Sequence, residues 1–92
     1  MSVQKDNSTI ANTLEKSDYH ALDASGLICP EPVMLLHKQM RKIKSGEVIK
    51  MTATDSSTER DVPRFCEYLR HALLLTQSNG NQYVYWIRKR QQ

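Results

Sequence analysis

The stretch GLICPEP, residues 26–32, decides how this 92-residue chain folds, because it sets a glycine-bearing turn directly before two prolines. Proline fits the first turn of a helix, where its missing N–H has no helical partner in any case. The stretch therefore predicts a turn from a strand into a helix. Cys29 lies at this junction, and the helix begins either at Pro30, with Cys29 as its cap, or at Pro32.

The segments on either side of this stretch carry the periodicities of a strand and of a helix. Residues 19–24 are partly alternating and end at the Ser-Gly pair 25–26, so they predict the first strand. Beyond the prolines, apolar residues recur at intervals of three and four up to Ile43. This spacing predicts an amphipathic helix, which the Ser-Gly pair 45–46 ends.

The rest of the chain predicts a second strand, a second helix and a closing hairpin. Residues 48–54 alternate cleanly, which predicts a strand with one face in water. Residues 56–61 are rich in capping side chains and predict a short turn, after which we expect the main helix to open at Pro63. Strand-like runs at 73–77 and 82–88 flank an Asn-Gly pair, a strong hairpin signal.

The order strand, helix, strand, helix, strand, strand fits a single two-layer domain over residues 19–92. We expect both helices on one face of the sheet and the other face in water. Residues 1–18 are mostly polar and are expected to form a flexible tail, with at most one short helix across Ile10 and Leu14.

Composition and charge favour a folded cytoplasmic protein. The chain is 39% hydrophobic, and no apolar run reaches the roughly 18 residues that span a bilayer. The N-terminus lacks the apolar core of a signal peptide, so we expect no contact with a membrane. The net charge of +3 suits an acidic partner, although surface Lys and Arg often serve solubility alone.

Cys29 is the candidate reactive residue. A thiol at a helix N-terminus faces unpaired N–H groups and the positive end of the helix dipole, whereas the nearby Glu31 carboxylate opposes ionisation, and we expect moderate activation. Cys66 falls on the apolar stripe of the second helix and is predicted to be a buried core thiol. Both thiols are expected to be free, and no CxxC motif supports a redox pair.

No cofactor and no metal is predicted. His20, His37 and His71 fall on three different predicted elements, and the cysteines lack metal-ligand spacing. A metal centre or a Cys–His hydrolase therefore has little support, and surface histidines are the better interpretation. What the residues leave is a single thiol whose chemistry is open.

Residues 22–32 and the helix that follows resemble the CPxP signature of the TusA/SirA-like sulfur carriers, and in particular the TusA branch. The similarity extends to residues 46–47, 60–66 and 83–89. It implies a two-layer α/β (α+β) sandwich of order βαβαββ, with a four-stranded mixed sheet and both helices on one face. The sequence departs from some relatives at Ile28, where a basic residue would stabilise the thiolate.

The resemblance also implies a function for Cys29. The cysteine would accept a sulfur as a persulfide from a cysteine desulfurase and pass it to a reactive cysteine of a downstream relay protein. The usual end point is 2-thiolation of the tRNA wobble uridine, with tRNA involved only indirectly. Such a protein acts as a persulfide carrier within a relay and not as a stand-alone enzyme. Gly26, Pro30, Glu31 and Pro32 would support the motif.

We hypothesise that Lys38, Arg41 and Asp55 flank the thiol and help to select partners. Two alternatives stay open. The same carrier chemistry would also serve molybdenum-cofactor assembly, oxidative sulfur metabolism or selenium handling. A small basic nucleic-acid-binding module would instead use the basic run at 88–90, but it would leave the Cys-Pro-Glu-Pro motif without a purpose.

Overall fold

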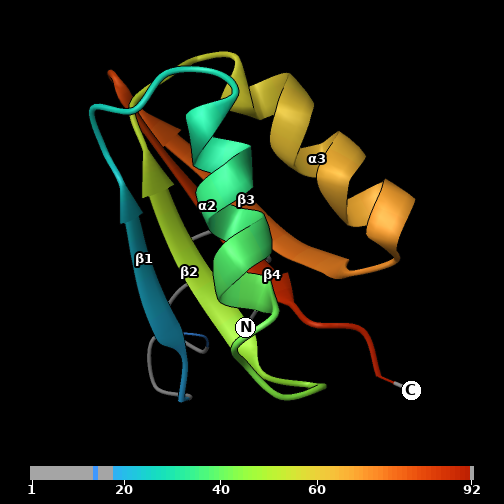
Figure 1. Cartoon of the computed structure of the whole chain (residues 1–92). Coiled ribbons are helices and arrows are strands. Elements are labelled where there is room, and N and C mark those ends of the chain that lie inside the picture. Colours follow the sequence, from blue (N-terminus) through green and yellow to red (C-terminus); the bar gives the residue numbers. More distant parts are fainter. Residues whose placement is uncertain (1–13, 15–17, 92) are drawn as a thin grey trace, which may run out of the picture.

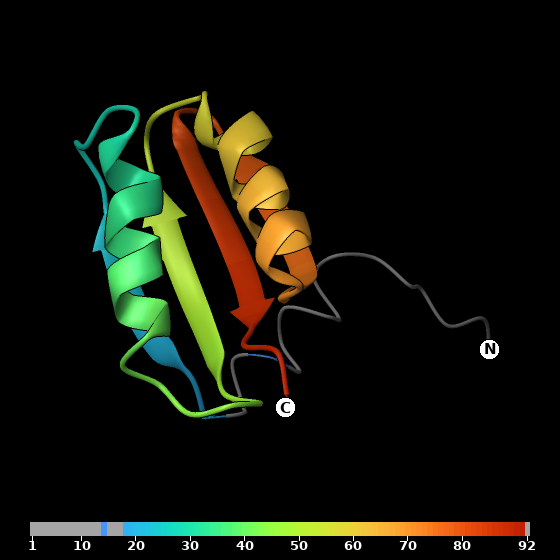
Figure 2. The same cartoon turned by 45° about the vertical axis from the view of Figure 1, so that its right-hand side comes forward.

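A computed structural model describes residue 14 and residues 18–91 as a sheet with two helices over one of its faces (Figures 1 and 2). The elements in chain order are β1 (His20–Ala24), α2 (Glu31–Met40), β2 (Val48–Ala53), α3 (Thr58–Leu69), β3 (Ala72–Asn79) and β4 (Gln82–Arg88). The two-layer α+β fold and its βαβαββ order are as predicted.

The sheet is mixed, with strand order β1-β2-β4-β3. β1 and β2 are parallel, while β4 is antiparallel to β2 and to β3. A parallel pair needs a long crossover, here supplied by α2, whereas β3 and β4 can be joined by a tight turn. Because β1 and β2 are parallel, their carboxyl ends lie at the same edge of the sheet. The chain segments after Ala24 and after Ala53 therefore meet.

The predicted closing hairpin is confirmed. Asn79 pairs with Gln82, which leaves Gly80 and Asn81 as a two-residue turn. Gly80 has a φ of 65°, and Asn81 is not among the positive-φ residues. Glycine at the first central position is typical of a type II′ turn, whose twist matches that of the flanking strands.

The core lies between the sheet and the helices. Alternation along β2 turns every second side chain inward, and both helices turn an apolar stripe toward them. The buried residues of this core include Leu36, Met40, Ile49, Met51, Ala53, Val62, Phe65, Cys66, Tyr85 and Ile87. Cys66 is 2% exposed, as predicted for a core thiol, and burial raises its pKa to about 11.

The sequence predicts that the opposite face of the sheet lies in water, but part of this face is covered. Trp86 is fully buried there, with Leu75 beside it, and the ring of Tyr19 stands edge-on to the indole at a centroid distance of 5.0 Å. Leu14 packs against the same cluster. The prediction was wrong because it assumed that no segment returns to this face, whereas residues that precede β1 pack against it.

α3 begins earlier than predicted, since it runs from Thr58 and contains Pro63 in its sixth position. A proline there removes only the N–H that would bond to the carbonyl of Glu59. The first turn is also held from outside the helix, because the Thr58 hydroxyl donates to the backbone carbonyl of Asp55 at 2.7 Å. This anchoring allows the helix to begin before the proline.

The predicted flexible tail, residues 1–18, lies outside the described residues except for Leu14 and Asp18. The possible helix across Ile10 and Leu14 likewise lies outside them apart from Leu14 itself. In the part of the chain that the structure describes, the helices are too short and too polar for any of them to cross a bilayer.

Candidate functional site

Cys29 lies in the loop between β1 and α2, two residues before Glu31, the first residue of the helix. α2 thus begins between the two starts that the sequence allows, with Pro30 as its cap and Pro32 in its first turn, and the peptide bond before Pro30 is cis. Cys29 is exposed and Cys66 is buried. A reacting partner can therefore reach only one of the two cysteines.

Asp55, two residues after the end of β2, holds the loop that carries the thiol. Its Oδ2 accepts the backbone N–H of Cys29 at 2.7 Å, and the neighbouring Thr54 Oγ1 accepts the N–H of Gly26 at 2.8 Å. Gly26 has a φ of 82°, a conformation that favours glycine. Asp55 also accepts the backbone N–H and the hydroxyl of Ser57 at 3.1 and 2.8 Å. Donors from Ser57 and then Cys29 lower the pKa of the Asp55 carboxyl.

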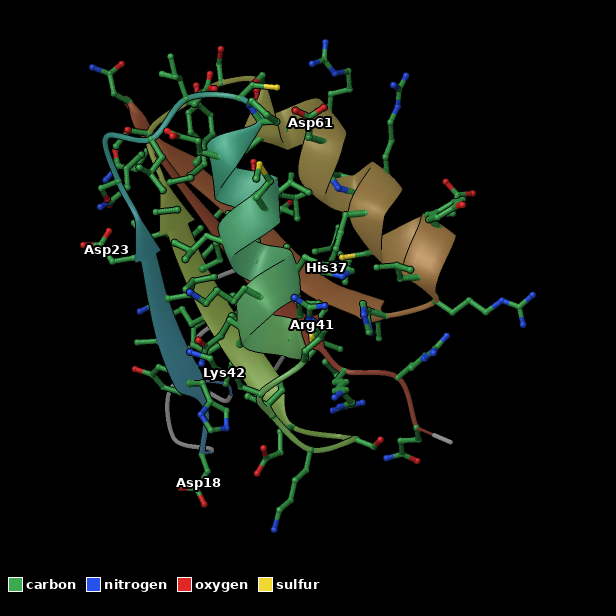
Figure 3. All side chains as sticks on the ribbon, in the orientation of Figure 1. Asp18, Asp23, His37, Arg41, Lys42 and Asp61 are labelled. Atoms are coloured by element: carbon green, nitrogen blue, oxygen red, sulfur yellow. The ribbon has the colours of Figure 1, made fainter. Side chains whose placement is uncertain are left out.

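Asp61, on the first turns of α3, contacts the thiol itself. Cys29 Sγ donates to Asp61 Oδ2 at 3.3 Å, and Arg60 Nε donates to Asp61 Oδ1 at 2.9 Å. Figure 3 shows Asp61 at the N-terminal end of α3, the end at which the chain leaves β2. The thiol therefore meets a carboxylate that comes from the second half of the chain.

This contact decides the ionisation of the thiol. The hydrogen bond to Asp61 raises the pKa of Cys29, because it is made by the neutral thiol and the thiolate would face a negative charge. Some loss of hydration raises the pKa further, whereas Ser57 and Arg60 lower it by less. The predicted moderate activation is therefore wrong in direction.

The start of α2 offers the thiol less than a helix N-terminus usually does. Pro30 and Pro32 have no N–H, and the N–H of Glu31 is donated to the carbonyl of Ile28 at 2.9 Å. Few donors are left to stabilise a thiolate, so the contact with the Asp61 carboxylate prevails over the helix dipole.

A hollow of about 630 Å³ opens between α2 and α3 beside the thiol. Apart from Cys29 it is lined by the apolar or aromatic residues Pro30, Val33, Phe65 and Tyr68 and by the charged residues Asp61, Arg64 and Glu67. Tyr68 is 86% exposed, and Ile28, which precedes the cysteine, is 69% exposed. Exposed apolar side chains next to a reactive group favour contact with another protein.

The three residues predicted to flank the thiol lie at different distances from it. Asp55 bonds to the thiol loop, and Lys38 lines a shallow hollow on α2 together with Glu31. Arg41 follows the last residue of α2, at the end of the helix remote from Asp61 (Figure 3). The ten residues of α2 span about 15 Å, so Arg41 does not flank the thiol.

Asp61 is absent from the site residues that the sequence predicts. A signal for it existed, because segments that follow two adjacent parallel strands meet at one edge of the sheet. That argument selects Asp55, which lies two residues after the end of β2. Asp61 requires in addition that α3 begin at Thr58, and the prediction of a helix opening at Pro63 concealed this.

The histidines lie apart from the thiol. His20 bonds to Glu47 at 3.1 Å, and the rings of His37 and His71 lie 5.8 and 5.7 Å from that of Phe65. Among the residues that the structure describes, no three His, Cys, Asp or Glu side chains gather closely enough to hold a metal ion.

The fold and the site define a class, that of small α+β proteins which present one exposed cysteine at a strand-to-helix turn. The sequence model of the family described as Sulfurtransferase TusA matches residues 20–89. The chain is 56% identical over 69 residues to "Sulfur carrier protein TusA" of Pseudomonas entomophila (strain L48). The matched region covers 75% of this chain and 86% of that protein. Pseudomonas putida (strain W619) has a protein of the same name that is 54% identical with the same coverage. The protein of that name from Pseudomonas aeruginosa (strain LESB58) is 52% identical over 75% of this chain and 87% of its own. The chain belongs to the TusA family.

Proposed function

We propose that this chain is a cytoplasmic sulfur carrier. Cys29 accepts a sulfane sulfur as a persulfide from a cysteine desulfurase and passes it to a reactive cysteine of the next relay protein. The destination we favour is 2-thiolation of the tRNA wobble uridine. The observation that carries the proposal is the exposure of Cys29 beside an open hollow while Cys66 is buried, and the name of the relatives supports it.

The chemistry needs one thiol and no external oxidant. In loading, the Cys29 thiolate attacks the terminal sulfur of the donor persulfide. A new S–S bond forms on Sγ, the S–S bond of the donor breaks, and the donor cysteine leaves with the electron pair. In unloading, an acceptor thiolate attacks the terminal sulfur of the Cys29 persulfide, and Cys29 leaves as the thiolate. Sulfane sulfur is moved without net oxidation.

Partner selection falls to the surface around the thiol, since a macromolecular thiol has to reach Sγ. Lys38 lies in the last turn of α2 and Arg41 caps its C-terminus, so both extend the contact surface along the helix beyond the thiol, and Asp55 fixes the loop. We assign Lys38 and Arg41 to docking. If reversing the charge of Arg41 leaves both partner affinity and transfer rate unchanged, its assignment is wrong.

Intact-mass analysis tests the carrier chemistry. The protein is incubated with a cysteine desulfurase and cysteine and weighed under non-reducing conditions. Loading predicts a gain of roughly 32 Da that disappears on adding dithiothreitol. Cys29→Ser should abolish the gain, and Cys66→Ala should keep it because that thiol is buried. If the Cys66 variant lost the mass gain and the Cys29 variant kept it, the assignment of the carrier site to Cys29 would be wrong.

A nucleic-acid-binding role is the alternative of a different class. Arg70, Arg88, Lys89 and Arg90 line a hollow of about 590 Å³. Arg88 pairs with Val48, the first residue of β2, so this basic hollow lies at the sheet edge opposite to Asp55. One of the cations in this hollow stabilises the fold, because Lys89 Nζ donates to the Ile43 carbonyl at 2.6 Å. Salt-dependent RNA binding without any sulfur loading would favour this alternative.

A further inference from the structure

In the contact between Cys29 and Asp61, the carboxylate is held in place by a second partner. Asp61 Oδ2 accepts from Cys29 Sγ at 3.3 Å while Oδ1 is occupied by Arg60 Nε at 2.9 Å. The Asp61 side chain is 20% exposed, against 59% for Arg60. The carboxylate is thus oriented against the loop and is not a freely moving surface group.

Asp61 keeps its negative charge at neutral pH. The hydrogen bond from Arg60 lowers its pKa most, and the Cys29 thiol and Arg64 lower it further. A carboxylate can only accept hydrogen bonds, so it suits the neutral thiol of the empty carrier and repels a sulfur anion.

The other groups around Sγ do not remove this preference. Asp55, on the segment after β2, bonds to the backbone N–H of Cys29 and adds a second negative charge. Ser57 and Arg60 favour the thiolate, but less than Asp61 opposes it. On α2, Glu31 is near in sequence, yet no hydrogen bond joins its side chain to Sγ within the described residues.

A persulfide on Cys29 meets Asp61 differently. A persulfide is a stronger acid than the corresponding thiol, so the loaded carrier bears a terminal sulfur anion with no proton to donate. Two negative groups within hydrogen-bonding distance repel each other. The hollow into which Sγ opens is lined by Asp61 itself and by Glu67, but also by apolar and aromatic residues and by Arg64, the one cation among its described lining residues.

Resting on the proposed carrier function, we propose that Asp61 is a further residue of the site, which accepts the hydrogen bond of the empty Cys29 thiol and turns the terminal sulfur of the loaded persulfide away from its own carboxylate, toward the apolar residues and Arg64 of the hollow between α2 and α3. The two loading states thereby present different surfaces to a partner. The empty thiol is bonded to the Asp61 carboxylate, and the loaded sulfur lies among Val33, Phe65 and Arg64.

The contact also gives unloading a direction. When the acceptor has taken the terminal sulfur, Cys29 leaves as a thiolate and takes up one proton from water. The resulting thiol donates to Asp61 and is then a poor nucleophile, because only the thiolate attacks sulfur. Return attack on the acceptor persulfide is slowed, and so is attack of the empty carrier on unrelated disulfides.

Alkylation of the empty carrier tests the first part of the proposal, that Asp61 holds the Cys29 thiol in its neutral form. Reduced wild-type protein, Asp61→Asn and Glu59→Gln are treated with iodoacetamide over a range of pH, and peptide mapping separates Cys29 from Cys66. Asp61→Asn should shift the Cys29 profile to lower pH and speed its reaction at neutral pH by about threefold or more. Glu59→Gln removes a carboxylate of α3 that lines a different hollow, and it should match the wild type. Profiles that coincide for all three proteins overturn the assignment.

Carbon-13 NMR of the Asp61 carboxyl group provides a readout that needs no Asp61 variant. In the empty wild-type protein its resonance should show a second, alkaline step when Cys29 ionises, and Cys29→Ser should lack it. Loading with inorganic polysulfide should abolish that step. A step that survives loading overturns the second part of the proposal, that the loaded sulfur leaves Asp61. Polysulfide loads the thiol without a desulfurase. Failure of desulfurase loading would therefore count against the carrier function and leave the Asp61 result standing.

Discussion

The Asp55 carboxylate accepts the backbone N–H of Cys29 at 2.7 Å, although 26 positions separate the two residues in the sequence. The same carboxylate accepts from Ser57 immediately before α3. Because β1 and β2 are parallel, the loops that follow them share one edge of the sheet, and Asp55 links these two loops. The position of the thiol is therefore set as much by the start of α3 as by the proline motif.

Asp55→Ala should loosen the thiol loop. The Cys29 N–H loses its acceptor and becomes free to open to water, so its amide hydrogen exchange should rise by about tenfold or more. Asp23→Ala is the matched control, because among the described residues that carboxylate accepts only from Ser25 in the neighbouring turn. It should leave the Cys29 amide unchanged. Equal exchange of this amide in both variants and the wild type would show that Asp55 does not hold the loop.

Acid should destabilise the protein, in part through Asp55. Hydrogen bonds from Ser57 and Cys29 hold the pKa of the folded Asp55 below its ordinary value of 3.8, so the unfolded chain binds more protons at low pH. The stabilisation is complete above that value and is lost as pH falls through the lower folded pKa. Urea unfolding between pH 6 and pH 2.5 should show the loss. Asp55→Asn should show a smaller decline, and an identical decline in both proteins would exclude Asp55 as a contributor.

Thr58 and Tyr85 form a buried hydrogen bond that fixes α3 against the sheet. The hydroxyls lie 2.8 Å apart, and the residues are 1% and 2% exposed. Thr58→Val leaves the Tyr85 hydroxyl without its partner and should cost about 1–3 kcal/mol of unfolding free energy. Thr58→Ser keeps the hydroxyl and should cost less. The double variant with Tyr85→Phe should recover part of the loss, as urea unfolding can measure, whereas strictly additive losses would contradict the pairing.

The sequence predicts those features of the fold that depend on local pattern. The Asn-Gly pair before Asn81 marks the hairpin, and the alternation from Ile49 to Ala53 marks a central strand, because turn chemistry and side-chain periodicity act within a few residues. The burial of Trp86 is not predicted in this way. It depends on where Leu14 and Tyr19 pack, and nothing in the local pattern of β4 records that.

The candidate site divides along the same line. Cys29 is predictable because its proline neighbours define a helix start, and Cys66 because it falls on an apolar stripe. The ionisation of Cys29 is not predictable from its neighbours, since the decisive carboxylate, Asp61, lies 32 positions away and on another helix. Only the pairing of β1 with β2 and the early start of α3 bring it to the sulfur.

Ile28→Arg should shift the pKa of the Cys29 thiol in the direction opposite to the effect of Asp61. Ile28 is 69% exposed, so the replacement disturbs no packing and adds a positive charge next to Cys29. A nearby positive charge favours the thiolate, so the pKa of Cys29 should fall and iodoacetamide alkylation near pH 7 should be faster than in the wild type. Ile28→Gln, with similar polarity and no charge, should leave the rate unchanged. Salt at 1 M should remove most of the gain, because it shortens the Debye length to about 3 Å. A gain that persists in salt, or appears equally with Gln, would mean that access and not charge governs the reactivity of Cys29.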